Sequence, residues 1–361
     1  DTYMAKDLPF PQSPVVPEMV DGGKTIQFQC RKGIACWNAC CSNIDISLTP
    51  YDILRLKRRL GLASAAFLQQ YAVPYEMEKD GIAGLKMQPV EGGSACQFMK
   101  PEGCGVYEDR PTACRYYPVA LLSMRKQDEY TDTHSYALVK EAHCLGHNEP
   151  RSLTIDDYRA EQGIKEYDAL GRGWRQLVLK KMSSGPTVGK PSVKSRQLFF
   201  MTCYDIDTFR AFVDSGPFKE LYDVPEAERQ AMLGDSQESE EALMQFGFRF
   251  LRQVLFGEES IPLHQEAADK RREQARTKAQ QAEREAAERL ARGFNPMGGE
   301  RGGGLLPSTD HLFLRMRGFE LDINELVPPG LPDIGFSSGA PFETEGCSNV
   351  RYFVPLQLQQ D

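Results

Sequence analysis

Hydrophobic and polar positions follow a helical spacing over much of this 361-residue sequence. Thr49 and Pro50 form a typical helix start, with the threonine as N-cap and the proline at the first helical position. Apolar residues recur along one helical face as far as Leu60, and Gly61 is expected to end this helix. A second short helix is predicted to begin at Ser64 and to reach Tyr71.

Later segments show the same periodicity. Helices are predicted for residues 155–170, 204–213 and 240–256, and the aromatic residues of the last one are expected to pack in the core. Alternating polar and apolar residues predict a short strand at residues 24–30, whereas residues 81–90 indicate a strand or a loop. The predicted fold class is therefore mainly α with irregular metal-binding loops and a few short strands, an α+β arrangement with small β content.

Three segments differ in composition from the rest. Residues 265–292 are mostly Ala, Glu, Gln, Lys and Arg, with acidic residues four positions before basic ones and Leu290 as the only large apolar residue. This pattern predicts a solvated helix, because the apolar seam of a coiled coil is missing. The proline-rich residues 1–24 predict an extended arm. Residues 305–361 are expected to dock on the main body or on a partner protein.

Charge and hydropathy exclude several classes of protein. A formal net charge of −8 and a pI near 5.4 argue against nucleic-acid binding, which requires an excess of Lys and Arg. No apolar stretch approaches the roughly 18 residues that a membrane span requires. Because no export signal is recognised at the amino end, we expect a reducing, cytoplasmic compartment. Closely spaced thiols are then expected to be metal ligands or redox groups rather than disulfides.

Cysteines supply the candidate chemistry, since eight of the ten lie within residues 30–144. The proposed metal ligands are Cys30, Cys36, Cys40, Cys41, Cys96, Cys104, Cys114 and Cys144. Four thiolates satisfy either a tetrahedral zinc ion or one iron–sulfur cluster, so eight permit two sites, and the spacing leaves their pairing open. Cys203 lies in an aromatic stretch and is expected to be a buried thiol, and Cys347 is expected to be free.

Several charged residues and histidines lie close in sequence to these cysteines. The side chains expected to provide compensating charge, hydrogen bonds or, for the histidines, imidazole ligands are Arg31, Arg110, Arg115, His143 and His147. The alternative is that they are ordinary surface or packing residues. A Cys–His nucleophile is disfavoured, because Cys144 beside His143 is the only candidate pair, and no catalytic residue is assigned.

The cysteine motifs resemble those of a known family. The segments that carry the resemblance are residues 36–41, 48–52, 96–99, 103–111 and 114–118. They are similar to the YkgJ-like cysteine-cluster family, a zinc- or iron-chelating domain that is often labelled an iron–sulfur oxidoreductase. The resemblance extends over residues 25–150. Five residues separate Cys30 from Cys36 and three separate Cys36 from Cys40, whereas the nominal family motif C-x-x-C-x-x-C-C has two residues in each gap. The resemblance therefore implies that the same cysteines are ligands, but not which of them share a centre.

Five parts are therefore expected along the chain. They are an extended arm (1–24), a cysteine-cluster metal-binding domain (25–150), a helical part packed on it (151–262), a charged solvated helix (263–293) and a glycine-rich linker with a docking segment (294–361). The arm and the docking segment are expected to contact a protein partner, without nucleic acid or a membrane span.

Three functions remain open at this level. The favoured one is a protein with one or two iron–sulfur centres, acting in redox transfer or in the maturation or modification of a partner protein, as the family label and the adjacent pair Cys40 and Cys41 indicate. The second is a zinc-stabilised, non-catalytic adaptor or subunit of a larger assembly. The third is a protein lysine methylase-like enzyme, because flagellin lysine methylases resemble the same cysteine pattern; no cosubstrate-binding motif accompanies it here. Enzymatic activity is thus left undecided.

Overall fold

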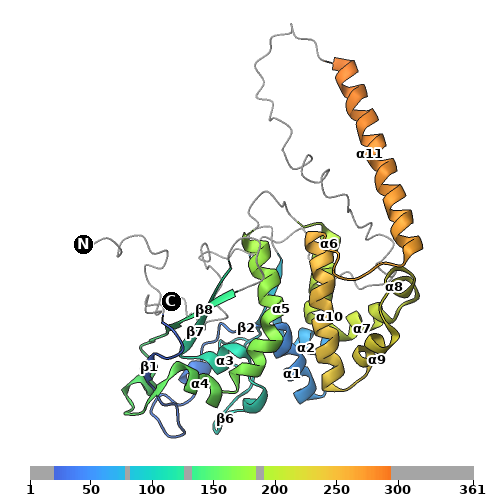
Figure 1. Ribbon diagram of the computed structural model, residues 1–361. Helices are drawn as coiled ribbons and strands as arrows, with labels where there is room; N and C mark the ends of the chain where they lie inside the picture. Colours follow the sequence, from blue (N-terminus) through green and yellow to red (C-terminus); the bar gives the residue numbers. More distant parts are fainter. Residues whose placement is uncertain (1–19, 78–81, 126–131, 184–190, 294–361) are drawn as a thin grey trace.

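The computed structural model describes residues 20–77, 82–125, 132–183 and 191–293. Most of the expected arm at residues 1–24, the linker and docking segment at 294–361, and Cys347 lie outside these described residues. Figure 1 shows the short strands gathered at one side of the molecule and a group of helices at the other, with the last described helix projecting from the body.

The strands are short and pair antiparallel. Their bounds are β1 (Thr25–Gln27), β2 (Ser47–Leu48), β3 (Ala72–Glu76), β4 (Ala83–Met87), β5 (Met99–Lys100), β6 (Gly103–Cys104), β7 (Val119–Arg125), β8 (Asp132–Leu138) and β9 (Ser152–Thr154). Within the described residues, β1 pairs with β9, β5 with β6 and β7 with β8, and the remaining sheet has the order β2-β4-β3. No described sheet exceeds three strands, which confirms the small β content.

Helices make up most of the remaining regular structure. Their bounds are α1 (Pro50–Leu60), α2 (Ser64–Tyr71), α3 (Thr112–Tyr116), α4 (Ile155–Glu161), α5 (Ile164–Ser183), α6 (Val193–Tyr204), α7 (Ile206–Asp214), α8 (Gly216–Leu221), α9 (Glu226–Leu233), α10 (Gln237–Phe256) and α11 (Gln265–Gly293). The described residues also form three short 3-10 helices, η1 (Ala39–Cys41), η2 (Tyr107–Asp109) and η3 (Leu145–Asn148). The mainly α fold class is confirmed.

The predicted ends of α1 are confirmed by its capping. Thr49 Oγ1 accepts a hydrogen bond from the Asp52 backbone N–H at 3.1 Å, and Asp52 Oδ2 accepts one from the Thr49 N–H at 2.8 Å. Gly61 takes φ of 64°, the left-handed conformation that glycine adopts readily at a helix end. The predicted helix that follows, α2, is also present.

The predicted single helix at residues 155–170 is wrong. Gly163, with φ of 66°, separates α4 from α5 there, because a left-handed residue cannot continue a right-handed helix. Likewise, residues 204–213 span two helices. Tyr204 ends α6 and Ile206 begins α7, whose N-cap is Asp205.

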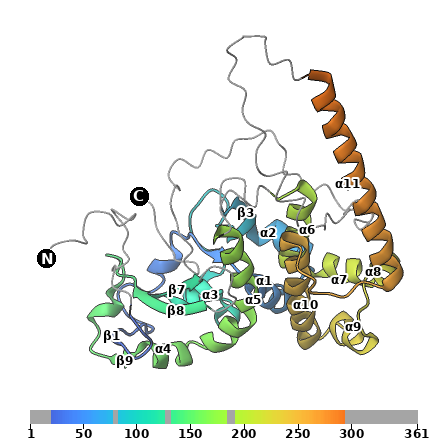
Figure 2. The same cartoon turned by 45° about the horizontal axis from the view of Figure 1, so that its top comes forward.

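The core of the helical part forms around α10, which packs against α5, α6 and α9. Figures 1 and 2 both show α5 and α10 side by side. Phe246 and Phe248 of α10 are buried, as their spacing predicts, and Phe250 contacts the rings of Phe209 and Phe212 from α7. This cluster is continuous with the apolar face of α1, so the helical part and the cysteine-rich part share one core.

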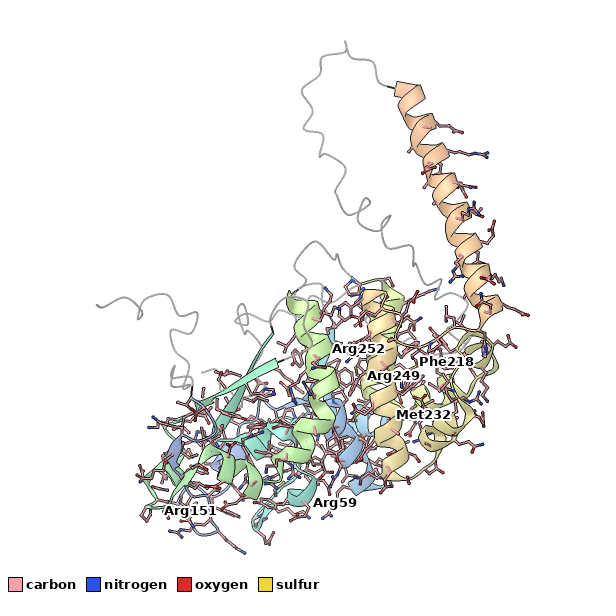
Figure 3. All side chains as sticks on the ribbon, in the orientation of Figure 1. Arg59, Arg151, Phe218, Met232, Arg249 and Arg252 are labelled. Carbon is pink, nitrogen blue, oxygen red and sulfur yellow. The ribbon has the colours of Figure 1, made fainter. Side chains whose placement is uncertain are left out.

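In contrast, none of the side chains of α11 that the structure describes is buried, as expected for a solvated helix. Figure 3 shows its side chains extending into solvent along the projecting helix. Among the described residues, none of the helices combines the length and apolarity that a membrane crossing requires.

Candidate metal centre

Loops and short elements carry the eight clustered cysteines. Cys30 follows β1, Cys36 lies in the next loop, Cys40 and Cys41 end η1, Cys96 precedes β5, Cys104 ends β6, Cys114 lies in α3, and Cys144 precedes η3. All are free thiols. Cys203 is also a free thiol and is buried in α6, as predicted.

The loop with Cys36 and Cys40 lies against the β5–β6 hairpin. Trp37 Nε1 donates to the Pro101 carbonyl at 3.3 Å, and Asn38 Nδ2 donates to the Lys100 carbonyl at 2.7 Å. Gly103 has φ of 124°, and a Cβ there would lie 2.9 Å from the Trp37 ring. Glycine is therefore required at this position both for backbone conformation and for close packing of the two cysteine loops.

Four of the thiols are neighbours of one another: Cys41, Cys96, Cys104 and Cys114. The Cys96 N–H donates to the Cys41 carbonyl at 2.8 Å, and β6 places Cys104 opposite Met99. Burial raises the pKa of Cys114, and the thiols of Cys96, Cys104 and Cys40 raise it further. We call these four residues the first thiol group.

The other four clustered thiols are also neighbours of one another. Burial raises the pKa of Cys30 to about 11, and Cys40, Cys36 and Cys144 add to this effect. Burial also raises the pKa of Cys144, again with contributions from Cys36 and Cys40. The Sγ atom of Cys40 lies 3.9 Å from that of Cys41, at the boundary between the two sets. Cys30, Cys36, Cys40 and Cys144 form the second thiol group.

Backbone N–H groups point at several of these sulfur atoms. Leu145 N–H donates to Cys36 Sγ at 3.3 Å, and Phe98 N–H donates to Cys96 Sγ at 3.4 Å. Such hydrogen bonds favour the thiolate over the thiol, which is the form that binds metal. They also tune the chemistry of a bound centre.

Among the arginines expected near the site, Arg110 is placed to compensate thiolate charge. Its Nη1 donates to the Tyr107 carbonyl at 2.6 Å and its Nη2 donates to Gln162 Oε1 at 2.6 Å. Its positive charge opposes the effect of burial on the pKa values of both Cys30 and Cys104, so it acts on both thiol groups.

The other two arginines make different contacts. Arg115 is buried and donates to the Glu108 carbonyl of η2, to the Gln162 carbonyl at 2.9 Å and to the Tyr167 hydroxyl of α5 at 3.0 Å. Its guanidinium therefore holds η2, α3 and α5 together. Arg31 pairs with Glu149 at 2.9 Å on the surface, with half of its side chain exposed.

The histidines beside Cys144 lie in two different settings. His147 Nε2 lies 3.0 Å from the Val139 carbonyl, and burial lowers the pKa of its imidazole. His143 Nε2 lies 3.5 Å from a carboxylate oxygen of Glu141. Glu141 did not emerge from the sequence, although its place three residues before Cys144 is a signal that would have found it.

The donor set fits zinc or iron–sulfur by its chemistry. Soft thiols are gathered in two groups, with backbone N–H donors and one guanidinium beside them. Within the described part of the chain, no three His, Cys, Asp or Glu side chains are already arranged to hold a metal ion.

Comparison with known proteins supports this chemistry. Residues 29–144 match a family model, CxxCxxCC, described as a "putative zinc- or iron-chelating domain". No curated protein and no solved structure matches the chain. The match begins one residue before Cys30 and ends at Cys144, so it spans all eight clustered cysteines. Residues 29–144 therefore form a domain that matches the CxxCxxCC zinc- or iron-chelating family, in agreement with the resemblance in the sequence.

Proposed function

We propose that residues 30–144 hold two metal centres, each bound by the four thiolates of one thiol group. The observation that carries this proposal is the arrangement of the other cysteines in two sets around the adjacent pair Cys40 and Cys41, with Cys40 acting on thiols of both sets. These two residues end a 3-10 helix, in which consecutive side chains point about 120° apart. One loop can thus supply a ligand to each centre.

The favoured content of these centres is iron–sulfur, and the favoured role is redox transfer to, or maturation of, a protein partner in a cytoplasmic, reducing compartment. Buried thiols with backbone N–H donors are the means by which proteins set the potential of such clusters. Arg110, placed to act on both thiol groups, would offset the net negative charge of four thiolates at each centre. An acidic overall charge disfavours a nucleic-acid partner.

A zinc-stabilised adaptor is the second candidate, because the family description names zinc as well as iron. Four thiolates close a tetrahedral zinc site and leave no position for a substrate. In that case, metal binding would contribute folding free energy, and function would depend on surfaces rather than on the centres.

Metal analysis of anaerobically purified protein separates these two functions. The proposal predicts iron and acid-labile sulfide, with absorbance between about 300 and 450 nm that bleaches with dithionite. A colourless protein with stoichiometric zinc would instead establish the adaptor and exclude the redox role.

A further inference from the structure

Beside the second thiol group lies a buried carboxylate that the thiol chemistry does not explain. The side chain of Glu141 is only 6% exposed, and its Oε2 atom makes no hydrogen bond within the described structure. Its negative charge lies close enough to the Cys40 thiol to act in the direction of a higher pKa for that thiol. A carboxylate in such surroundings is unfavourable unless a positive charge accompanies it.

Two further polar groups surround this carboxylate. His143 Nε2 lies 3.5 Å from Glu141 Oε2 and is likewise buried without a hydrogen bond. The Tyr117 ring stacks on His143, with the ring centroids 6.5 Å apart and the planes within 8°. The Tyr117 hydroxyl faces Glu141 and Cys144 but makes no hydrogen bond of regular geometry. Three buried polar atoms without a regular hydrogen bond thus lie together beside Cys144, and native proteins usually place an ion or ordered water next to such atoms.

An ion fits this set better than water alone. Water would satisfy hydrogen-bonding capacity, but the positive partner beside the carboxylate would then be His143, which is charged only when it is protonated, whereas a metal ion carries its positive charge at any pH. Carboxylate oxygen and imidazole nitrogen are established ligands of zinc and iron, and they combine with thiolates in sites that keep an exchangeable position.

We propose that Glu141 and His143 are additional donors to the centre of the second thiol group, so that the two centres differ in kind. This inference rests on the proposed function. The first thiol group provides sulfur donors only and suits a closed, structural centre. The second offers more donors than a four-coordinate ion requires, which makes it the centre able to exchange a ligand with a substrate or a partner.

Cobalt(II) tests the inference, since its visible bands respond to the type of donor. The full-length, metal-free chain would be reconstituted anaerobically with Co²⁺ as wild type, Glu141→Gln and His143→Gln. Both variants are expected to shift the bands of one cobalt ion per chain and to speed its release to a chelator about ten-fold or more. The other ion should keep its spectrum and release rate.

Matched controls are Glu259→Gln and His264→Gln in the segment after α10, where Glu259 is exposed and His264 lies 3.1 Å from the Lys219 carbonyl. They should behave as wild type. Unchanged spectra and release rates in both test variants would overturn the inference, as would changes at the other ion. Should Glu141→Gln fail to fold, His143→Gln decides alone, since a quarter of that side chain is exposed. A wild-type chain that binds no cobalt, zinc or iron would refute the proposed function itself.

Discussion

At the scale of single residues, Asp52 links a helix cap to the cysteine-rich region. Besides capping α1, its Oδ1 atom accepts hydrogen bonds from the N–H and the hydroxyl of Thr112 at 2.8 and 2.7 Å. Thr112 is the first residue of α3, which receives no side-chain cap from its own N-cap residue, Pro111. Asp52 therefore caps two helices at once and positions the helix that carries Cys114.

Replacing Asp52 with Asn tests this arrangement. The amide NH₂ would face a backbone N–H of one of the two helices, so that at least one buried donor loses its partner. We expect the free energy of unfolding, measured in urea, to fall by about 1–3 kcal/mol. Asp45→Asn is the control, because Asp45 makes a half-exposed pair with Lys86 and should change stability by less than about 1 kcal/mol. Equal effects of the two substitutions would contradict the capping role.

The proposed ligand roles of Cys40 and Cys41 predict a linked loss of metal and stability. Replacing either with Ser should lower the metal content and the melting temperature together, because ligand binding contributes folding free energy. Cys203→Ala is the control. It leaves a small cavity in the core and lowers stability by about 1 kcal/mol, with metal content unchanged. Full metal content in both Cys40 and Cys41 variants would show that neither is a ligand.

At the scale of elements, the predictions succeeded where signals are local. Thr49, Pro50 and Gly61 mark the ends of α1 within a dozen residues, so a reading of the sequence finds that helix. The β7–β8 hairpin was not predicted, because Val119–Arg125 has little alternation and depends on its partner strand and on the core for stability. The two thiol groups join residues as distant as Cys30 and Cys144, which sequence spacing cannot pair.

An ion network joins three helices of the body. Lys57 Nζ of α1 lies 3.0 Å from Asp207 Oδ1 of α7 and 2.7 Å from Glu240 Oε1 of α10. Burial acts to raise the pKa of Asp207, but the Ser64 N–H and the Lys57 ammonium outweigh it and lower that pKa. The stabilisation is therefore present above the unfolded pKa, about 3.9, and is lost as pH falls through the lower folded value.

Replacing Asp207 with Asn should remove this pH dependence. The variant is expected to be about 1 kcal/mol less stable than wild type at neutral pH, because a charge-assisted hydrogen bond is lost. The difference should shrink as pH falls below about 4. Urea unfolding at a series of pH values measures this difference in the free energy of unfolding. The control is Asp269→Asn on the exposed helix α11, which we expect to leave stability unchanged at every pH. A difference that stays constant with pH would contradict the role of Asp207.

At the scale of the whole molecule, the cysteine-rich part and the helical part pack together through α1, α3 and α5, whereas α11 projects from this body. The division of the chain into an arm, a metal-binding domain, a helical part, a charged helix and a docking segment remains a proposal. In this division, every proposed metal ligand lies in the metal-binding domain at residues 25–150.

Deletion of residues 265–361 tests that division. All eight clustered cysteines and the contact between Leu221 and His264 remain in the shortened chain. We therefore expect the metal content per chain and the melting temperature to stay close to those of the full chain. Metal analysis of both proteins, purified in parallel, provides the measurement. A clear loss of metal would show that the deleted part completes a centre.

The most direct test of two separate metal centres is the ratio of metal to protein in two double variants. Cys30→Ser with Cys36→Ser disables the second thiol group, and Cys96→Ser with Cys114→Ser disables the first. Two separate centres predict that each variant loses one centre and retains the other, so that each keeps half of the wild-type metal. Loss of all metal in both variants, or of none in either, would contradict the account.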